Sequence, residues 1–395
     1  MRLLQKRFAK YNAPQVAMKN GLYSFYHPIE TGQDTEVIIK GQKALMFGSN
    51  SYLGLTNHPE IIKAAKDALD KYGSGASGSR LMNGNLDLHV ELENELAEFV
   101  NKPAATVFST GFQVNMGTIP CLMGRNDLIV IDDKNHASII EGCRLAFAKT
   151  LKYKHNDMHG LERILQKADK NQMTLIVTDG IFSMEGDIAK LDKICELADK
   201  YSASVMVDDA HGLGVIGEHG SGTASYYNLT DKVDLIMGTF SKSFASIGGF
   251  VAGDFETINY IRHNARSLLF SAGIPPASAA TVLKALEIIK REPERICRLW
   301  ENANYASECL LQESFSIGDS TTPIIPIFIG DDIKTYQYGT MLLEEGIYVN
   351  PVVSPGVEKG KAILRFSLMS SHSKEQIDIA IDKLVKCRKI IETKQ

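Results

Sequence analysis

From residue 46 to about residue 290, short apolar runs alternate with longer amphipathic stretches. The apolar runs are bounded by Gly, Asp or Ser and have the length of buried strands: Ala105–Ser109, Leu128–Ile131, Leu175–Thr178, Val205–Val207, Leu235–Met237 and Phe250–Ala252. Between them, helical spacing is found in Glu60–Tyr72, Leu88–Val100, Leu161–Ala168 and Leu191–Tyr201. This alternation predicts an α/β fold with a mostly parallel sheet covered by helices on both faces. Ligands of such sheets bind beyond the carboxyl ends of the strands.

The pattern divides the chain into three parts. We predict an N-terminal arm over residues 1–45, a large domain over 46–290 and a small C-terminal α/β domain over 291–395. A helix over Ala277–Arg291 follows a Pro-Pro pair and closes the large domain. The small domain is predicted from helices and strands at Arg295–Leu311, Ile324–Ile329, Thr335–Glu345, Ala362–Ser367 and Lys374–Ile391.

The arm combines basic and apolar side chains. Its basic residues are Arg2, Lys6, Arg7, Lys10 and Lys19, and they alternate with Leu3, Leu4 and Phe8. One interpretation is a solvated, partly helical leader. The other is a weak contact with a membrane surface or an acyl chain, because basic and apolar residues together favour an interface.

Composition excludes several classes of protein. A length of 395 residues fits two domains or one large α/β unit. The chain has 43 Lys and Arg against 47 Asp and Glu, so it lacks the excess of basic residues that is typical of a nucleic-acid-binding domain. No apolar run approaches the roughly 18 residues that a membrane-spanning helix needs. The six cysteines form no CxxC pair, so we expect reduced thiols and no metal site. Because the first ten residues lack the apolar core of a signal peptide, we expect a cytoplasmic protein.

One lysine stands where a ligand would bind. Lys242 follows the predicted strand Leu235–Met237 and has the hydroxyl residues Thr239 and Ser241 beside it. It is either an ordinary surface ammonium or an amine that forms a Schiff base with an aldehyde, while the hydroxyls bind a phosphate. The second interpretation describes the lysine of a pyridoxal 5'-phosphate (PLP) enzyme.

A second strand end carries an acid and an imidazole. Asp208 ends the run Val205–Val207, and His211 follows three residues later. A carboxylate beside a pyridinium nitrogen keeps that ring protonated and makes PLP a strong electron sink. Asp208 is our choice for this role, and His211 for a contact with the PLP 3' oxygen. The alternative is an acid that caps the next turn, a role we assign to Asp209.

Three further segments also follow predicted strands. Gly111 permits a close backbone approach, and a helix that begins there aims N–H groups at a phosphate. His136 either stacks on a cofactor ring or is structural, and Ser183 offers a hydrogen-bond donor. The glycines of Tyr72–Gly78 do not match a dinucleotide-binding fingerprint, since no strand precedes them.

Seven motifs, in this order, resemble those of the α-oxoamine synthases, a branch of the fold-type I PLP enzymes. They are GSNSYLGL, GSGASGSRLMNG, STGFQVN, DKNHASI, TDGIFSMEGD, VDDAHGLGVIGEHG and GTFSKSFASIGGF. The resemblance covers nearly the whole chain, from Gly48 to Ser367. It implies the fold of a PLP-dependent transferase, a large PLP-binding domain over 46–290, and a homodimer whose active sites are shared between two copies.

The resemblance also implies a role for each matching residue. Lys242 matches the Schiff-base lysine, and Asp208 the partner of the pyridine nitrogen. His136 matches a histidine that stacks over the ring and contacts the substrate carboxylate. The residues that match contacts to the 3' oxygen are Ser183 and His211. Those that match the phosphate pocket are Gly111, Phe112, Thr239 and Ser241, with Ser271 and Ala272 reaching the phosphate of the other subunit. Asn50 and Arg365 match the groups that hold the amino-acid carboxylate.

Within the family, LKYKHNDM, RHNARSLLFSA and GTFSKSFASIGGFVAG are most similar to the branch that condenses L-serine with a long-chain acyl-CoA. The expected reaction gives 3-oxosphinganine, CoA and CO2 from serine and palmitoyl-CoA. Members that join glycine to acetyl-CoA or alanine to pimeloyl-CoA are the alternatives, and they typically carry Gly where Ser241 stands. An inactive partner subunit is a third alternative, disfavoured because such subunits lack the lysine that Lys242 supplies. The loop Pro351–Pro355 lacks an arginine found in some relatives, which leaves Arg365 and His136 to hold the carboxylate.

Overall fold

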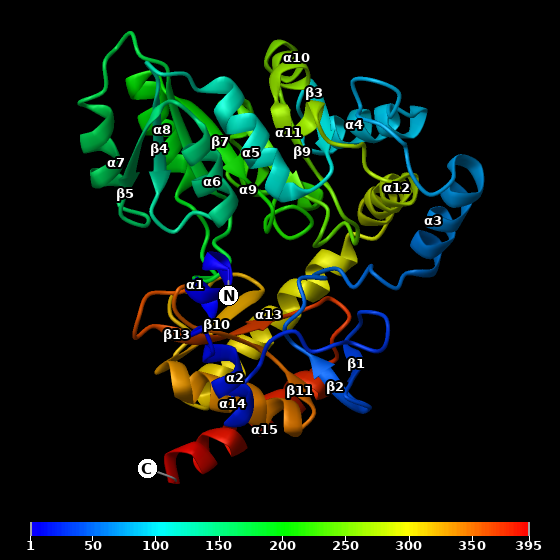
Figure 1. Cartoon of the computed structure of the whole chain (residues 1–395), viewed down its shortest axis with the longest axis vertical. Coiled ribbons are helices and arrows are strands. Elements are labelled where there is room, and N and C mark those ends of the chain that lie inside the picture. The colour runs from blue at the N-terminus through cyan, green and yellow to red at the C-terminus, as the bar shows by residue number, and fades with distance from the viewer. Residues whose placement is uncertain (1, 394–395) are drawn as a thin grey trace.

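The computed structural model describes residues 2–393, and its centre is a seven-stranded sheet with the order β3-β9-β8-β7-β6-β4-β5 (Figure 1). The strands are β3 Ala104–Phe108, β4 Leu128–Asp132, β5 Lys149–Tyr153, β6 Thr174–Asp179, β7 Ser204–Asp208, β8 Leu235–Thr239 and β9 Gly249–Gly253. β9 pairs antiparallel with β3 and with β8, and the other pairs are parallel. The predicted α/β fold with a mostly parallel sheet is confirmed.

Alternate residues of these strands face two separate apolar cores. Val205 and Val207 of β7 belong to one core, while Met206 between them belongs to the other. The helices that contribute to the first core include α4 Asp87–Phe99, α7 Met158–Leu165, α8 Leu191–Tyr201 and α12 Pro276–Arg291, and this core continues into the C-terminal part of the chain. Those of the second are α5 Gly111–Leu122, α6 Ala137–Leu145, α10 Phe255–Asn264 and α11 Arg266–Leu269. Because both faces are covered, the strands are continuous apolar runs rather than alternating ones.

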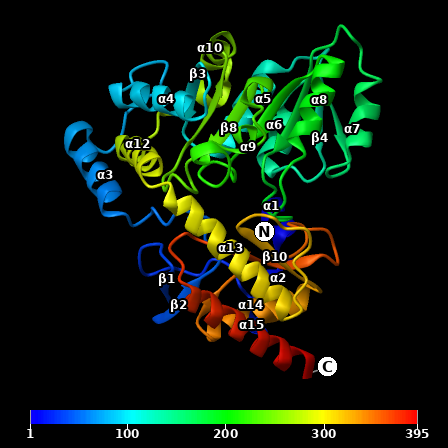
Figure 2. The same cartoon turned by 180° about the vertical axis from the view of Figure 1, so that it is seen from behind.

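The C-terminal part forms two three-stranded sheets. One contains β10 Ile324–Gly330, β13 Ala362–Ser367 and β12 Asn350–Val352, and the other contains β1 Glu36–Ile39, β2 Gln42–Met46 and β11 Ile347–Tyr348. Their helices are α13 Glu294–Gln312, α14 Asp332–Glu344 and α15 Lys374–Thr393. α13 starts directly after Pro293 and runs from the large sheet's half of the molecule into the other half (Figure 2).

The predicted arm is wrong in its second half. Residues 36–46 form the hairpin β1–β2, and β2 pairs parallel with β11, so this segment belongs to a sheet of the C-terminal part. Before it lie α1 Leu3–Phe8 and α2 Ala13–Lys19, neither of which has a buried residue. The predicted partly helical leader therefore describes the first 19 residues only. The division into domains at residue 290 stays a prediction.

The remaining elements complete the large half. α3 Pro59–Tyr72 packs along α12. α9 Thr223–Tyr226 and the 3-10 turns η1 Glu218–Gly220 and η2 Thr230–Lys232 lie between β7 and β8. None of the helices within residues 2–393 has the length and hydropathy needed to cross a bilayer.

Candidate active site

The carboxyl ends of the parallel strands and the start of α5 surround a cavity of about 370 Å³. Most of the predicted site residues line it, although they come from five segments far apart in the sequence. They are Gly111, Phe112, His136, Ser183, Asp208, His211, Thr239, Ser241 and Lys242. The cavity lies where parallel α/β sheets bind their ligands, since loops and helix N-termini converge at that edge.

Part of the cavity lining has the features of a phosphate site. α5 begins at Gly111, and the side chain of Thr110 caps it by accepting a hydrogen bond from the Gln113 amide at 3.2 Å. A Cβ on Gly111 would stand 2.5 Å from Oγ1 of Thr239, so only glycine fits beside that hydroxyl. The hydroxyls of Thr239 and Ser241 lie 3.0 Å apart. Free N–H groups at a helix start and two hydroxyls fit the phosphate of PLP.

Lys242 supplies an amine to the same cavity. It follows β8, and desolvation by burial lowers its pKa to about 8, although the negative charge of Asp208 opposes this shift. A lysine with such a pKa has a substantial fraction of free amine near neutral pH, which Schiff-base formation requires. The cavity residues thus fit PLP at both its aldehyde and its phosphate.

Asp208 is a buried carboxylate held by a residue that sequence reasoning missed. Its Oδ2 accepts a hydrogen bond from Nδ2 of Asn115 at 2.7 Å, and its Oδ1 accepts one from the Ala210 amide at 3.1 Å. Asn115 also donates to Oγ of Ser138 at 2.8 Å. Asn115 lies in the STGFQVN motif, one helical turn after Gly111. This spacing, which places both residues on the same face of a helix, is the sequence signal that could have identified Asn115.

His136 is oriented from both sides. Its backbone N–H donates to Oδ2 of Asp179 at 2.7 Å, and its Nδ1 lies 2.7 Å from Oγ of Ser138. Burial lowers the pKa of His136, so the ring is neutral at physiological pH. Burial and repulsion from Asp208 raise the pKa of Asp179 well above its usual range. A neutral imidazole at the cavity wall suits stacking on a cofactor ring.

Asn50 and Arg365 meet beside the cavity rather than in its lining. Arg365 on β13 is 4% exposed, and its Nη1 donates to Oδ1 of Asn50 at 3.0 Å. Its Nε donates to the carbonyl of Ser183 at 2.7 Å, which ties the C-terminal part to the cavity loop. The two predicted carboxylate-binding residues are thus brought together, and their role in substrate binding stays a prediction.

Ser271 and Ala272 lie outside the cavity of their own chain. Oγ of Ser271 accepts a hydrogen bond from Nε2 of Gln113 at 3.3 Å, and the carbonyl of Ala272 accepts one from Oγ of Ser109. Both residues therefore contact residues that flank the start of α5. Their predicted contact with the phosphate of another subunit stays a prediction.

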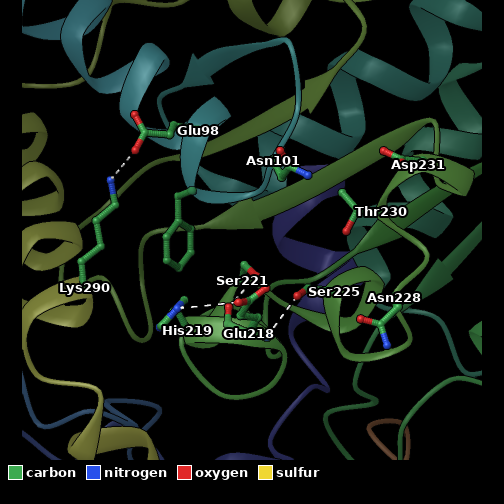
Figure 3. Close-up of a pocket in the computed structure, with 11 residues that line it drawn as sticks. Glu98, Asn101, Glu218, His219, Ser221, Ser225, Asn228, Thr230, Asp231 and Lys290 are labelled. Atoms are coloured by element: carbon green, nitrogen blue, oxygen red, sulfur yellow. Dashed lines mark hydrogen bonds and ion pairs between the residues drawn. The ribbon is translucent and has the colours of Figure 1, made fainter.

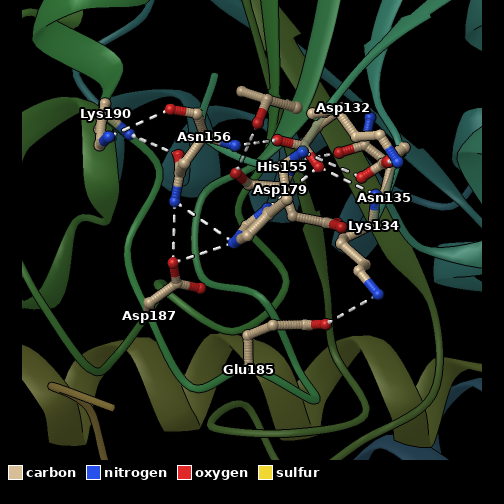
Figure 4. Close-up of polar contacts among 12 residues, drawn as sticks. Asp132, Lys134, Asn135, His155, Asn156, Asp179, Glu185, Asp187 and Lys190 are labelled. Carbon is tan, nitrogen blue, oxygen red and sulfur yellow. Dashed lines mark hydrogen bonds and ion pairs between the residues drawn. The ribbon is translucent and has the colours of Figure 1, made fainter. Parts of the chain in front are cut away.

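A polar network outside the cavity holds two of its loops (Figure 4). Nδ1 of His155 lies 3.0 Å from Oδ1 of Asp132, and its Nε2 lies 3.0 Å from Oδ2 of Asp187. Desolvation disfavours the charged ring, but the hydrogen bonds to these two carboxylates outweigh it and raise the pKa of His155 to about 10. The imidazolium joins the end of β4, before His136, to the loop of Ser183. His155 lies in the LKYKHNDM motif, which indicated the family but predicted no role for this residue.

A larger cavity, of about 640 Å³, lies away from the predicted residues (Figure 3). The lysine that lines it is already paired, since Lys290 contacts Glu95 at 2.9 Å and Glu98 at 3.3 Å. None of the predicted site residues lines it. Size alone therefore does not identify the active site in this molecule.

The arrangement is that of a PLP enzyme, and comparison with known families agrees. A model of the family described as aminotransferase class I and II matches residues 42–384. The chain therefore belongs to the class I and II aminotransferase family, whose cofactor is PLP.

Individual relatives are more specific. The chain is 56% identical over 389 residues to a serine palmitoyltransferase of Sphingobacterium spiritivorum, with 98% of each chain covered. It is 52% identical to the serine palmitoyltransferase of Bacteroides thetaiotaomicron, covering 99% of this chain and 100% of the relative. It is also 43% identical to the 8-amino-7-oxononanoate synthase of Thermoanaerobacter pseudethanolicus, with 94% of each covered. These names confirm the predicted resemblance to the α-oxoamine synthases.

Solved structures give the same result. The serine palmitoyltransferase of Sphingomonas wittichii superposes with a TM-score of 0.94 at 32% identity, and 100% of each chain is covered. A lysine-to-alanine variant of serine palmitoyltransferase from S. paucimobilis, with a bound PLP–myriocin aldimine, superposes with a TM-score of 0.96 at 32% identity and 100% coverage of both. The predicted PLP-transferase fold is confirmed.

The first prediction concerns His155 and the free energy of unfolding. Because its folded pKa of about 10 lies above the ordinary value of 6.5, its contribution is complete below about pH 6.5 and is lost as pH rises through 10. We expect His155→Gln to lower Tm by roughly 5 °C at pH 6. The difference should close towards pH 10 in a differential scanning calorimetry series.

The exposed His159 on α7 provides the matched control, and His159→Gln should leave Tm unchanged at every pH. A Tm difference for His155→Gln that stayed constant from pH 6 to pH 10 would contradict the charged ring.

Proposed function

We propose that this chain catalyses the PLP-dependent condensation of L-serine with palmitoyl-CoA to 3-oxosphinganine, CoA and CO2, the first step of sphingolipid synthesis. One observation carries the proposal: Lys242, Asp208 and a phosphate cradle meet in one cavity. The choice of serine and palmitoyl-CoA as substrates is supported by the 52–56% identity, over nearly the full chain, to relatives named serine palmitoyltransferase.

The residues of the cavity divide the work. When bound, PLP withdraws electrons from Cα of the amino acid and stabilises negative charge there. Lys242 would hold the aldehyde of PLP and, as a free amine, would accept the Cα proton of the amino acid; its lowered pKa increases the fraction of free amine available for this role. Asp208, fixed by Asn115, keeps the ring nitrogen protonated.

The substrate carboxylate is held from a second direction. Arg365 donates to Asn50 and to the Ser183 carbonyl, and its guanidinium is the planar donor that suits a carboxylate. His136, neutral and oriented by Ser138, would stack on the PLP ring and contact the same carboxylate. Orientation of this group matters because the carboxylate leaves as CO2 after the new carbon–carbon bond has formed.

Another α-oxoamine synthase reaction is the second candidate. The 8-amino-7-oxononanoate synthases reach 43–44% identity with the chain, so the core chemistry is shared. Glycine with acetyl-CoA or alanine with pimeloyl-CoA would use the same lysine and aspartate. Serine remains our proposal because identity to the serine palmitoyltransferases is higher.

Substrate choice tests the proposal. The purified protein is assayed with serine, glycine or alanine against palmitoyl-, pimeloyl- and acetyl-CoA, with CoA release and product mass as readouts. We expect kcat/KM for serine with palmitoyl-CoA to exceed every other pair by at least about tenfold. Lys242→Ala, the control, should release no CoA. Faster turnover of alanine with pimeloyl-CoA would identify the second candidate instead.

We also propose a homodimer in which Ser271 and Ala272 reach the phosphate site of the second copy. Large apolar side chains are exposed on both sides of the bridge between Ser79 and Ala272, including Met82 at 77% and Phe270 at 79%. Such patches favour association, and a second copy of this chain that supplies Ser271 would cover them.

Light scattering after size-exclusion chromatography tests the dimer. We expect the intact protein at twice the mass of one chain, and Phe270→Asp at about one chain mass with PLP bound at least about tenfold more weakly, because a charge would be buried at the interface. Phe255→Asp, at the exposed start of α10, should stay dimeric. An unchanged mass for Phe270→Asp would contradict this interface.

Peripheral membrane contact and a cytoplasmic location stay predictions. α1 lies at the junction of the two halves in both views, with Leu3 84% and Leu4 70% exposed and with Lys6 and Arg7 in its last turn. A cationic, apolar helix of this kind suits an anionic lipid surface. Co-sedimentation with anionic vesicles that is lost in Leu4→Asp supports the contact, and no co-sedimentation of the intact protein refutes it.

A further inference from the structure

Tyr52 joins the cofactor side of the site to the carboxylate side. The residue lies in the GSNSYLGL motif, and its side chain is 1% exposed. Its hydroxyl is 2.7 Å from Nδ1 of His211, which lines the cavity. The same oxygen is 3.4 Å from Nη2 of Arg365 and 3.4 Å from Oδ1 of Asn50. Tyr52 itself does not line the cavity, so it acts there only through His211.

The donors and acceptors around this hydroxyl decide where its proton lies. Arg365 can only donate, so the Tyr52 oxygen accepts from Nη2 and its own hydrogen must go elsewhere. Nδ1 of His211 is nearer to the Tyr52 oxygen than Oδ1 of Asn50 is (2.7 Å against 3.4 Å), so it takes that hydrogen. An imidazole that accepts at Nδ1 carries its single proton at Nε2.

The charges that face the pair keep both partners neutral. Burial, with the positive charges of Lys242 and Arg365 and the nearby His136, lowers the pKa of His211 well below its usual value. Burial raises the pKa of Tyr52, although Arg365 opposes this shift. At physiological pH the contact therefore joins a phenol to a neutral imidazole. Nε2 of His211 has no hydrogen-bond partner among the described residues and is free to meet a ligand.

We propose that Tyr52 is a positioning residue that fixes His211 as the Nε2–H tautomer. The cavity wall then presents a donor to the 3' oxygen of PLP, which carries negative charge and would be repelled by a lone pair. Because Tyr52 also accepts from Arg365, the group that holds the amino-acid carboxylate and the group that meets the cofactor are oriented through one hydroxyl. The tautomer stands without the proposed function, whereas the coupling to the cofactor and to serine rests on it.

The tautomer is measured in the cofactor-free protein by ¹⁵N NMR of labelled histidine, with the His211 signal assigned from its absence in His211→Gln. We expect a protonated Nε2 and an unprotonated Nδ1 in the intact protein. In Tyr52→Phe, we expect both tautomers to be populated. The control is Tyr153→Phe on β5, another buried tyrosine, whose hydroxyl has no hydrogen-bond partner within residues 2–393, and it should leave the His211 signal unchanged. A proton on Nδ1 in the intact protein overturns the proposal, and this result does not depend on the folding of Tyr52→Phe.

The cofactor-bound protein provides the second readout. Loss of the Nε2 donor should move the pH-dependent absorbance change of bound PLP in Tyr52→Phe to higher pH by roughly half a unit to one unit. KM for serine should rise about fivefold or more while kcat falls less, as the Arg365 side loses its orientation. An unchanged titration in Tyr52→Phe would contradict the coupling. A protein that binds PLP but never turns over serine would refute the proposed function and leave the tautomer result standing.

Discussion

The hydrogen bond from Asn115 to Asp208 is the interaction on which the site depends. A carboxylate buried at the end of a central strand is costly unless donors compensate it, and here an amide from α5 and a backbone N–H supply them. The same Asn115 donates to Ser138, which in turn orients His136. The Asn115 amide therefore fixes the position of Asp208 directly and that of His136 through Ser138. α5 also begins at Gly111, beside the proposed phosphate site. The same helix therefore carries both the residue that holds Asp208 and the first residue of the phosphate site.

A second constraint links the two halves of the molecule. Arg365 comes from a strand of the C-terminal part, yet its guanidinium donates to the Ser183 carbonyl at the cavity. Lys134, next to the loop of His136, pairs with Glu358 of the C-terminal part at 2.6 Å. The proposed site is thus assembled from two sheets: the mostly parallel sheet supplies the proposed cofactor-binding residues, and the antiparallel sheet supplies Arg365, the proposed carboxylate-binding residue. Neither half of the molecule contains all of the proposed site residues.

Much of this could be predicted from the sequence, for physical reasons that also explain the failures. The central strands are buried on both faces, so they stand out as apolar runs, and their polar last residues indicate the ligand edge. β5 was missed because it is an edge strand in which Lys149 and Lys152 interrupt the apolar pattern. The hairpin β1–β2 was taken for part of an arm because its pairing with β11, three hundred residues away, leaves no local pattern. Asn115, Tyr52 and His155 were missed as site residues for the same reason: their partners are distant in the chain.

We propose that the amine of Lys242 holds the cofactor in the cavity that Asp208 also lines. The most direct measurement is to load the protein with PLP, reduce it with borohydride and locate the attached pyridoxyl group by peptide mass spectrometry. The account predicts one modified lysine, Lys242, and no site modification in Lys242→Ala. A pyridoxyl group on any other lysine, with Lys242 unmodified, would contradict it.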